Sequence, residues 1–259
     1  SIDGGASIGG QLGRRFYSEI ATRECDWPER ASPTSWRLWF PNGWELISLT
    51  SLSSGGTAIA VGNLQLYPKS GPPYRRIEVD LSSASSFTAG STHQGSIDVT
   101  GLWGYTDEFE PAGTLAAAIS TTTATSVTVS SGAAFGVGDT IKAGTERLVV
   151  TGRGAEVDSG QNLGGSGLTA QASADAVTVS DGTGFALYEV ITIGTESMLI
   201  VKIAGNVLTV KRAWDGTTLA QHTAGVDVYV SRSFTVARGS LGTTAATHLN
   251  GAAITRHVV

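Results

Sequence analysis

Residues 127–130 read Val-Thr-Val-Ser, and the same four residues recur at positions 177–180. The alternation of Val with small polar residues is typical of a β-strand with one buried face. The repeat continues downstream at the same offset of 50 positions. Gly132, Phe135, Ile141 and Gly144-Thr145-Glu146 match Gly182, Phe185, Ile191 and Gly194-Thr195-Glu196.

A second repeat lies closer to the C-terminus and has an offset of 26 positions. Residues 208–212 (LTVKR) match residues 234–238 (FTVAR). A Gly-Thr-Thr stretch, a histidine and a glycine follow in both copies. The matched positions are Gly216 with Gly242, His222 with His248, and Gly225 with Gly251.

The order of these half-motifs is first, first, second, second, whereas a tandem duplication would alternate them. We therefore expect one module to be nested in another. Residues 126–152 and 231–258 would form a split module, and residues 176–230 a nested module with Ala204-Gly205-Asn206 as its internal turn. The Gly-rich stretch 153–175 would connect them.

Composition favours a mainly β protein. The chain has 259 residues, of which 34 are Gly and only one is Met, and charged residues make up 15%. We expect a β-rich domain over residues 1–110 with a short helix at 6–17, where Ile8, Leu12 and Phe16 share a face. Residues 111–125 would be a linker, and the modules that follow would be small barrels or sandwiches. No apolar run is long enough for a membrane-spanning helix.

No motif for catalysis, metal binding or a cofactor stands out, so we expect no enzyme activity. His222 and His248 follow Arg212 and Arg238 by ten positions in the two copies. A metal pair or a general base is one interpretation; a structural histidine that hydrogen-bonds backbone in a turn is favoured, because a catalytic residue need not recur in both copies. The acidic cluster at 107–110 fits a cation site less well than a solvated loop or an interface rim.

Arginine and tryptophan indicate protein–protein contacts. Arg outnumbers Lys by 13 to 4, and Arg and Trp are the commonest residues at binding hot spots. The net charge of −5 argues against a nucleic-acid-binding protein. The interface candidates are Arg14, Arg15, Trp27, Trp36, Trp39, Arg75, Arg76, Trp103 and Tyr105.

An ordered set of motifs in residues 1–110 resembles the head–tail connector proteins of tailed bacteriophages, also called adaptor or head-completion proteins. In that family the segment Val-Thr-Gly-x-Trp-Gly-Tyr closes the β portion. The motifs are RRFY at 14–17, TRECDWP at 22–28, LYPKSGPPYRRIE at 66–78 and IDVTGLWGY at 97–105. The repeats resemble β modules of phage virion proteins.

The resemblance implies a structural virion protein, made in the bacterial cytoplasm and located at the neck of the phage. Its partners would be the portal protein, a tail or stopper protein, and the capsid. The chain would form a ring of about twelve identical subunits, through which DNA passes without specific binding, and would need no cofactor and no membrane. The alternative from a different class is a receptor- or glycan-binding protein of the tail or head fibre, or a capsid decoration protein.

Overall fold

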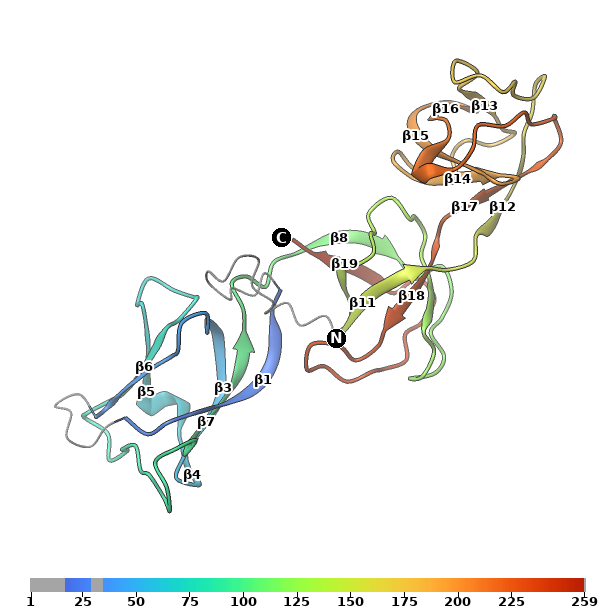
Figure 1. Cartoon of the computed structure of the whole chain (residues 1–259). Coiled ribbons are helices and arrows are strands. Elements are labelled where there is room, and N and C mark those ends of the chain that lie inside the picture. The colour runs from blue at the N-terminus through green and yellow to red at the C-terminus, as the bar shows by residue number, and fades with distance from the viewer. Residues whose placement is uncertain (1–16, 29–34, 259) are drawn as a thin grey trace. The chain divides into compact units, whose positions relative to one another are not determined.

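The computed structural model describes residues 17–28 and 35–258 (Figure 1). Strands dominate these residues, and the only helical elements among them are two short 3-10 helices, η2 (Val61–Asn63) and η3 (Trp214–Gly216). The mainly β class expected from composition is confirmed. The short helix expected at 6–17 lies outside the described residues, except for Tyr17.

The described residues divide into two compact units. The first contains residues 17–28 and 35–109, together with Leu241–Thr243 and residues 257–258. The second contains Glu110–Ser240 and Thr244–Arg256.

Two antiparallel sheets enclose the core of the first unit. One has the strand order β1 (Glu19–Cys25), β7 (Ile97–Trp103), β3 (Leu46–Ser54) and β4 (Thr57–Ile59). The other has the order β2 (Arg37–Trp39), β6 (Arg76–Val79) and β5 (Leu64–Tyr67). Both sheets contribute side chains to one hydrophobic cluster.

Trp103 lies at the centre of this cluster and is fully buried. Its ring packs edge-on against Phe40 and Trp44, with centroid distances of 5.0 and 5.8 Å. The indole N–H donates to the backbone oxygen of Ala21 at 3.0 Å, so the polar atom of this buried ring is satisfied.

The second unit contains two six-stranded antiparallel sheets. We call the first the split module, because its strands come from both sides of residues 154–232. Its strand order is β8 (Phe109–Thr114), β19 (Ala253–His257), β10 (Thr140–Ala143), β11 (Glu146–Arg153), β18 (Ser233–Ala237) and β9 (Ser126–Thr128).

The other sheet, which we call the inner module, is built from consecutive strands. Its order is β12 (Val157–Asn162), β17 (Asp227–Val230), β14 (Val190–Ile193), β15 (Glu196–Ala204), β16 (Val207–Lys211) and β13 (Ala176–Thr178). Each module has its own hydrophobic cluster.

The two sheets have the same strand order once their strands are matched through the sequence repeats. Strands β9, β10 and β11 correspond to β13, β14 and β15, while β18 and β19 correspond to β16 and β17. The remaining pair, β8 and β12, occupies the same edge of each sheet. The two modules are therefore two copies of one fold.

Two segments expected to be connectors belong to the modules instead. In 111–125, β8 lies in the sheet, and Leu115 and Ile119 are buried in its core. In 153–175, β12 pairs with β17, and Leu163 and Leu168 are buried in the inner module. The Gly residues that indicated flexibility lie within an ordered edge strand and its turns.

Candidate functional site

The sheet β2-β6-β5 presents one apolar face and one polar face, because successive residues of a strand point to opposite sides. Ile77 and Val79 of the central strand β6 are buried in the core of the first unit, next to Leu38 and Leu64 of the flanking strands. The alternate residues of β6, Arg76 and Glu78, therefore lie on the outer face.

A row of three side chains crosses this outer face. Trp39 of β2 and Tyr67 of β5 are both direct register partners of Arg76, one on each side of it. The guanidinium carbon lies 4.6 Å from the Trp39 ring centroid and 4.3 Å from that of Tyr67. Arg76 thus contacts the faces of two aromatic rings through cation–π interactions.

A second row fixes Arg76 from the side. Glu78 contacts the Nε atom of Arg76 at 2.7 Å and the Nε atom of Arg37 at 3.1 Å. The Glu78 side chain is only 8% exposed, so these ion pairs lie in a desolvated setting. Arg37 in turn covers the ring of Trp36 at 4.1 Å.

A groove of about 750 Å³ opens beside this row. The loop that joins β5 to β6 forms much of its wall, and Tyr105 contributes from the segment after β7. Among residues 17–28 and 35–258, its lining contains three aromatic rings, three prolines and three basic side chains, but no carboxylate and no carboxamide. The lining residues are Trp39, Tyr67, Pro68, Lys69, Ser70, Gly71, Pro72, Pro73, Arg75, Arg76 and Tyr105.

The aromatic and basic groups of the groove reach solvent. Trp39 is 60% exposed and Tyr105 48% exposed, so both rings are accessible to a partner. The side chain of Arg75 is 59% exposed, and one of its terminal nitrogens contacts Glu45 at 3.0 Å. The groove is therefore an apolar surface with positive charge, in a chain whose net charge is negative.

Four of the interface candidates chosen from sequence meet at this groove: Trp39, Arg75, Arg76 and Tyr105. Trp36 lies beside Arg37, and Trp27 is half-buried against the core. Trp103 is fully buried in that core and is unavailable to a partner. Arg14 and Arg15 lie outside the described residues.

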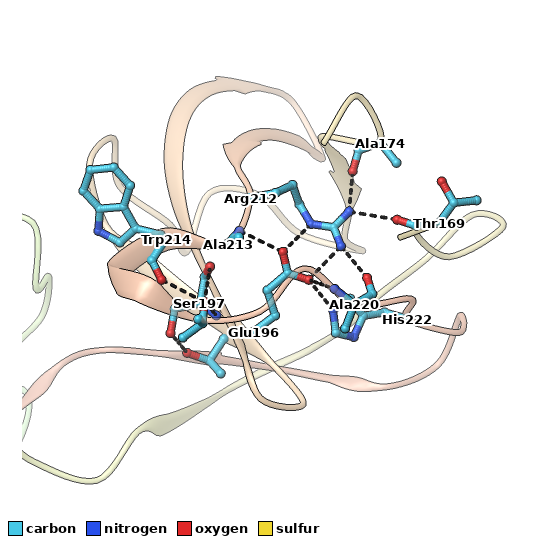
Figure 2. A network of polar contacts seen from close by, with 11 residues as sticks. Thr169, Ala174, Glu196, Ser197, Arg212, Ala213, Trp214, Ala220 and His222 are labelled. Carbon is cyan, nitrogen blue, oxygen red and sulfur yellow. Dashed lines mark hydrogen bonds and ion pairs between the residues drawn. The ribbon is translucent and has the colours of Figure 1, made fainter. Parts of the chain in front are cut away.

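The repeated Arg and His residues belong to a different kind of site, a buried polar network in each module. Figure 2 shows the carboxylate of Glu196 facing the guanidinium of Arg212 and the ring of His222. Arg212 donates through Nε and Nη2 at 2.8 and 2.7 Å, and the Nε2 atom of His222 lies at 2.9 Å. The backbone amides of Ala213 and Ala220 complete the set at 2.9 and 3.0 Å.

The split module contains the same network around Glu146. Arg238 donates through Nε and Nη2 at 2.7 and 2.9 Å, and the Nε2 atom of His248 lies at 2.7 Å. The backbone amides of Gly239 and Ala246 occupy the places of Ala213 and Ala220. In both copies Nη1, and Nη2 through a further hydrogen bond, donate to backbone carbonyl oxygens.

These carboxylates are held ionised. Burial by itself raises the pKa of Glu196, but hydrogen bonds from Arg212, His222 and the two amides outweigh it and lower the pKa to about 2. The same groups around Glu146 lower its pKa to about 2. Both carboxylates are inaccessible to solvent and saturated with donors, so the arrangement suits a structural role rather than acid–base catalysis.

Comparisons with models of protein families, with curated proteins and with solved structures found no match to this chain.

The partner of the two histidines was not anticipated. A structural role was expected, but with a backbone partner, whereas each ring binds a buried glutamate. The signal was present in the sequence, because Glu146 and Glu196 recur at the first offset while the Arg and His residues recur at the second. A buried cation repeated in two copies requires an anion repeated in both.

Among residues 17–28 and 35–258, no group of three His, Cys, Asp or Glu side chains could hold a metal ion. The acidic cluster is partly used in other contacts: Asp107 accepts a hydrogen bond from Ser18, and Glu110 pairs with Arg256. Cys25 is buried, and burial raises the pKa of its thiol to about 11. No helix in the described part of the chain has the length and apolar character needed to cross a membrane.

Proposed function

We propose that the chain is a structural protein of a tailed-phage virion, a head–tail connector that binds protein partners through the groove on the outer face of sheet β2-β6-β5. The observation that carries this proposal is the groove itself. It combines Trp39, Tyr67 and Tyr105 with Arg75 and Arg76, and Trp, Tyr and Arg are the residues most enriched at binding hot spots. Two sequence motifs of the connector resemblance, at 66–78 and 97–105, supply most of its lining.

The proposed assembly is a ring of identical subunits between the portal and the tail. To test it, the chain is co-expressed with the portal protein encoded in the same phage genome, and the mass of the purified complex is measured by light scattering. We expect co-purification and a mass several times that of one subunit. A double variant, Trp39→Ala with Arg76→Glu, should abolish both, whereas Lys211→Gln should preserve them, because Lys211 lies on β16 of the inner module and does not line the groove. A chain that stays monomeric and does not co-purify with the portal protein would contradict the proposal.

DNA would pass through the ring without being held. The chain has 17 basic and 22 acidic residues, and so lacks the basic excess that neutralisation of phosphates requires. We expect the isolated protein to show no salt-dependent affinity for duplex DNA near physiological ionic strength.

The second candidate function is glycan or receptor binding by a fibre or decoration protein. The exposed rings of Trp39 and Tyr105 favour it, because sugars stack on such surfaces. A glycan array separates the two functions. Binding of a defined glycan by a monomeric chain would support this candidate against the connector.

We also propose that the inner module arose as a copy of the split module and was inserted at one of its turns. Pairing of β9 and β11 with β18, and of β10 with β19, supports this. Arg153 and Ser231, at the two ends of the insert, are joined by a hydrogen bond of 2.8 Å. Val129 donates to the backbone oxygen of Arg232 as Val179 does to that of Asn206, so the insertion point corresponds to the turn at 204–206.

A further inference from the structure

We propose that the groove binds an acidic, extended segment of a partner protein, and that Arg76 receives a carboxylate of this segment between the rings of Trp39 and Tyr67. The inference rests on the proposed function, because it names the chemistry of the partner at the same surface. It is argued from the unused donors of Arg76, from the charge of the lining and from the kinds of side chain that the lining lacks.

Arg76 is oriented, and its outer edge is unused. The two rings fix the plane of the guanidinium, and Glu78 occupies the Nε side. Within the described part of the chain, its terminal nitrogens Nη1 and Nη2 donate no hydrogen bond, and the shortest ion-pair contact of the guanidinium is the one at Nε. A guanidinium edge with two parallel N–H donors matches the two oxygens of a carboxylate. The entropy cost of ordering the arginine is already met in the folded unit.

The described lining of the groove carries basic side chains and no carboxylate. Arg75 and Lys69 line the groove together with Arg76, and the ammonium of Lys69 lies 4.7 Å from the ring centroid of Tyr67. The nearest buried carboxylates, Glu45 and Glu78, are paired with arginines and do not line the groove. Charge complementarity therefore selects an acidic ligand.

The lining favours a peptide over a sugar. Sugar hydroxyls are commonly bound by planar acceptors and donors such as Asp, Asn, Glu or Gln, and the described lining of the groove contains none of them. Three prolines and three aromatic rings give it the apolar character that extended peptide segments find in aromatic-lined grooves. Its volume of about 750 Å³ is sufficient for a few residues.

The test uses the full chain and a synthetic peptide with fluorescein on its N-terminal amine, fluorescein-Gly-Glu-Pro-Glu-Phe-Glu-Gly-amide, with a counterpart in which every Glu is Gln. Binding is measured by fluorescence anisotropy at low ionic strength. We expect the Glu peptide to bind at least about tenfold more tightly than the Gln peptide, because hydrogen bonds to charged groups carry that difference. Unlabelled oligogalacturonate, a carboxylate-bearing glycan, is added as a competitor and should not displace the peptide.

Arg76→Gln should weaken binding of the Glu peptide at least about tenfold. Lys211→Gln is the matched control, because Lys211 also covers a tryptophan, Trp214 at 5.0 Å, but lies on β16 of the inner module and does not line the groove. It should leave the affinity unchanged. If Arg76→Gln fails to fold, as judged by circular dichroism, Trp39→Ala decides the matter, because this 60% exposed side chain is removed without opening the core.

The proposal is overturned if the Glu peptide does not bind, if the Gln peptide binds equally well, if the folded groove variants retain full affinity, or if oligogalacturonate displaces the peptide. Peptide binding without ring assembly would keep this site and remove the connector function. Ring assembly without peptide binding would support the connector function and overturn the proposed peptide site.

Discussion

The inner and split modules build the same buried network from very different lengths of chain. In the inner module, 16 positions separate Glu196 from Arg212. In the split module, 92 positions separate Glu146 from Arg238. The Nε-to-carboxylate distances nevertheless differ by only 0.1 Å, at 2.8 and 2.7 Å.

Strand register therefore sets this geometry, and distance along the chain does not. Glu196 and Glu146 begin β15 and β11, and each of these strands pairs with the strand that leads to the arginine. Loop-closure entropy grows only slowly with loop length, so a long insert at a turn adds little cost as long as its ends lie close together. The hydrogen bond from Arg153 to Ser231 holds those ends in place.

The two modules differ in the group that accepts a hydrogen bond from the matched glycine amides, Gly182 and Gly132. In the inner module the amide of Gly182 donates to the Oδ1 atom of Asn206 in its own turn, at 3.2 Å. In the split module the matching amide, of Gly132, donates to the Oε1 atom of Glu189 in the inner module, at 2.9 Å. Glu189 also binds Arg232 at 2.6 Å. In the split module the acceptor thus comes from Glu189 of the inner module, whereas in the inner module it comes from the turn residue Asn206.

The largest effect should follow removal of either buried carboxylate. Glu196→Gln leaves the Arg212 side chain, which is 1% exposed, without its counter-ion. Loss of one partner of a buried ion pair costs about 3–5 kcal/mol. We expect a decrease of this size in the free energy of unfolding, and the same decrease for Glu146→Gln. Urea denaturation followed by circular dichroism measures both.

Glu110→Gln is the control, because its ion pair with Arg256 is exposed and should contribute at most about 1 kcal/mol. Equal decreases in the free energy of unfolding of Glu196→Gln and Glu146→Gln would support the equivalence of the two modules. A loss below about 1 kcal/mol in only one of them would break it.

Acid should destabilise both modules over the same pH range. The pKa of each glutamate is about 2 in the folded chain and 4.5 for a free side chain. Because the folded value is the lower one, the stabilisation is complete above about pH 4.5 and is lost as the pH falls towards 2, reaching about 3 kcal/mol per network. Urea midpoints measured between pH 2 and 7 report it. The two Glu→Gln variants should each lose part of this pH dependence, and different onsets for the two would contradict the equivalence.

A methyl group at the matched glycines should distinguish the two turns. In Gly182→Ala the new Cβ would collide with the carbonyl oxygen of Gly205, and in Gly132→Ala with that of Ser231. Such overpacking costs about 1–3 kcal/mol. We expect Gly132→Ala to cost more, because Ser231 is tied to Arg153 and Val190, whereas Gly205 lies at a hairpin tip. Thermal denaturation compares them. Gly184→Ala, which meets no atom within 4 Å, should be neutral.

The smallest effect should come from the turn of the inner module. Asn206→Ala removes the acceptor for Gly182 and a donor to the backbone oxygen of Ser180 at 2.8 Å. We expect a loss of about 1 kcal/mol, the usual value for an exposed hydrogen-bonded turn. Hydrogen exchange should show faster exchange in β13 and β16 only. Faster exchange throughout the split module would show that the two sheets do not respond separately.

The sequence predicts the strands that carry exact repeats and misses those that do not. Strands β8 and β12 correspond in the fold, but their residues share almost no identity, because edge strands need only alternate and pair. Leu115 and Leu163 are the visible remnant, and both are buried. Without a repeated motif, these segments read as linkers.

The sequence predicts some residues of the groove but not how they come together. Trp39 and Arg76 were chosen for their residue types, but their contact depends on register across β2, β6 and β5, which no local pattern encodes. Trp103 could have been assigned to the core, since in β7 it shares the parity of the buried residues Ile97 and Val99. Residue type indicates that a tryptophan makes contacts, and its position in the strand decides whether these contacts are with the core or with a partner.

The turn at Ala204-Gly205-Asn206 occupies, in the inner module, the position at which the split module receives its insert. The turn at 204–206 is therefore a position at which a further domain could be inserted. A guest domain whose termini lie close together could be inserted between Gly205 and Asn206. It would be connected to the inner module as the inner module is connected to the split module, and the two sheets would keep their strand order. Insertion of further domains at this one turn would lengthen the chain, and it gives the protein engineer a defined position at which to display a guest domain.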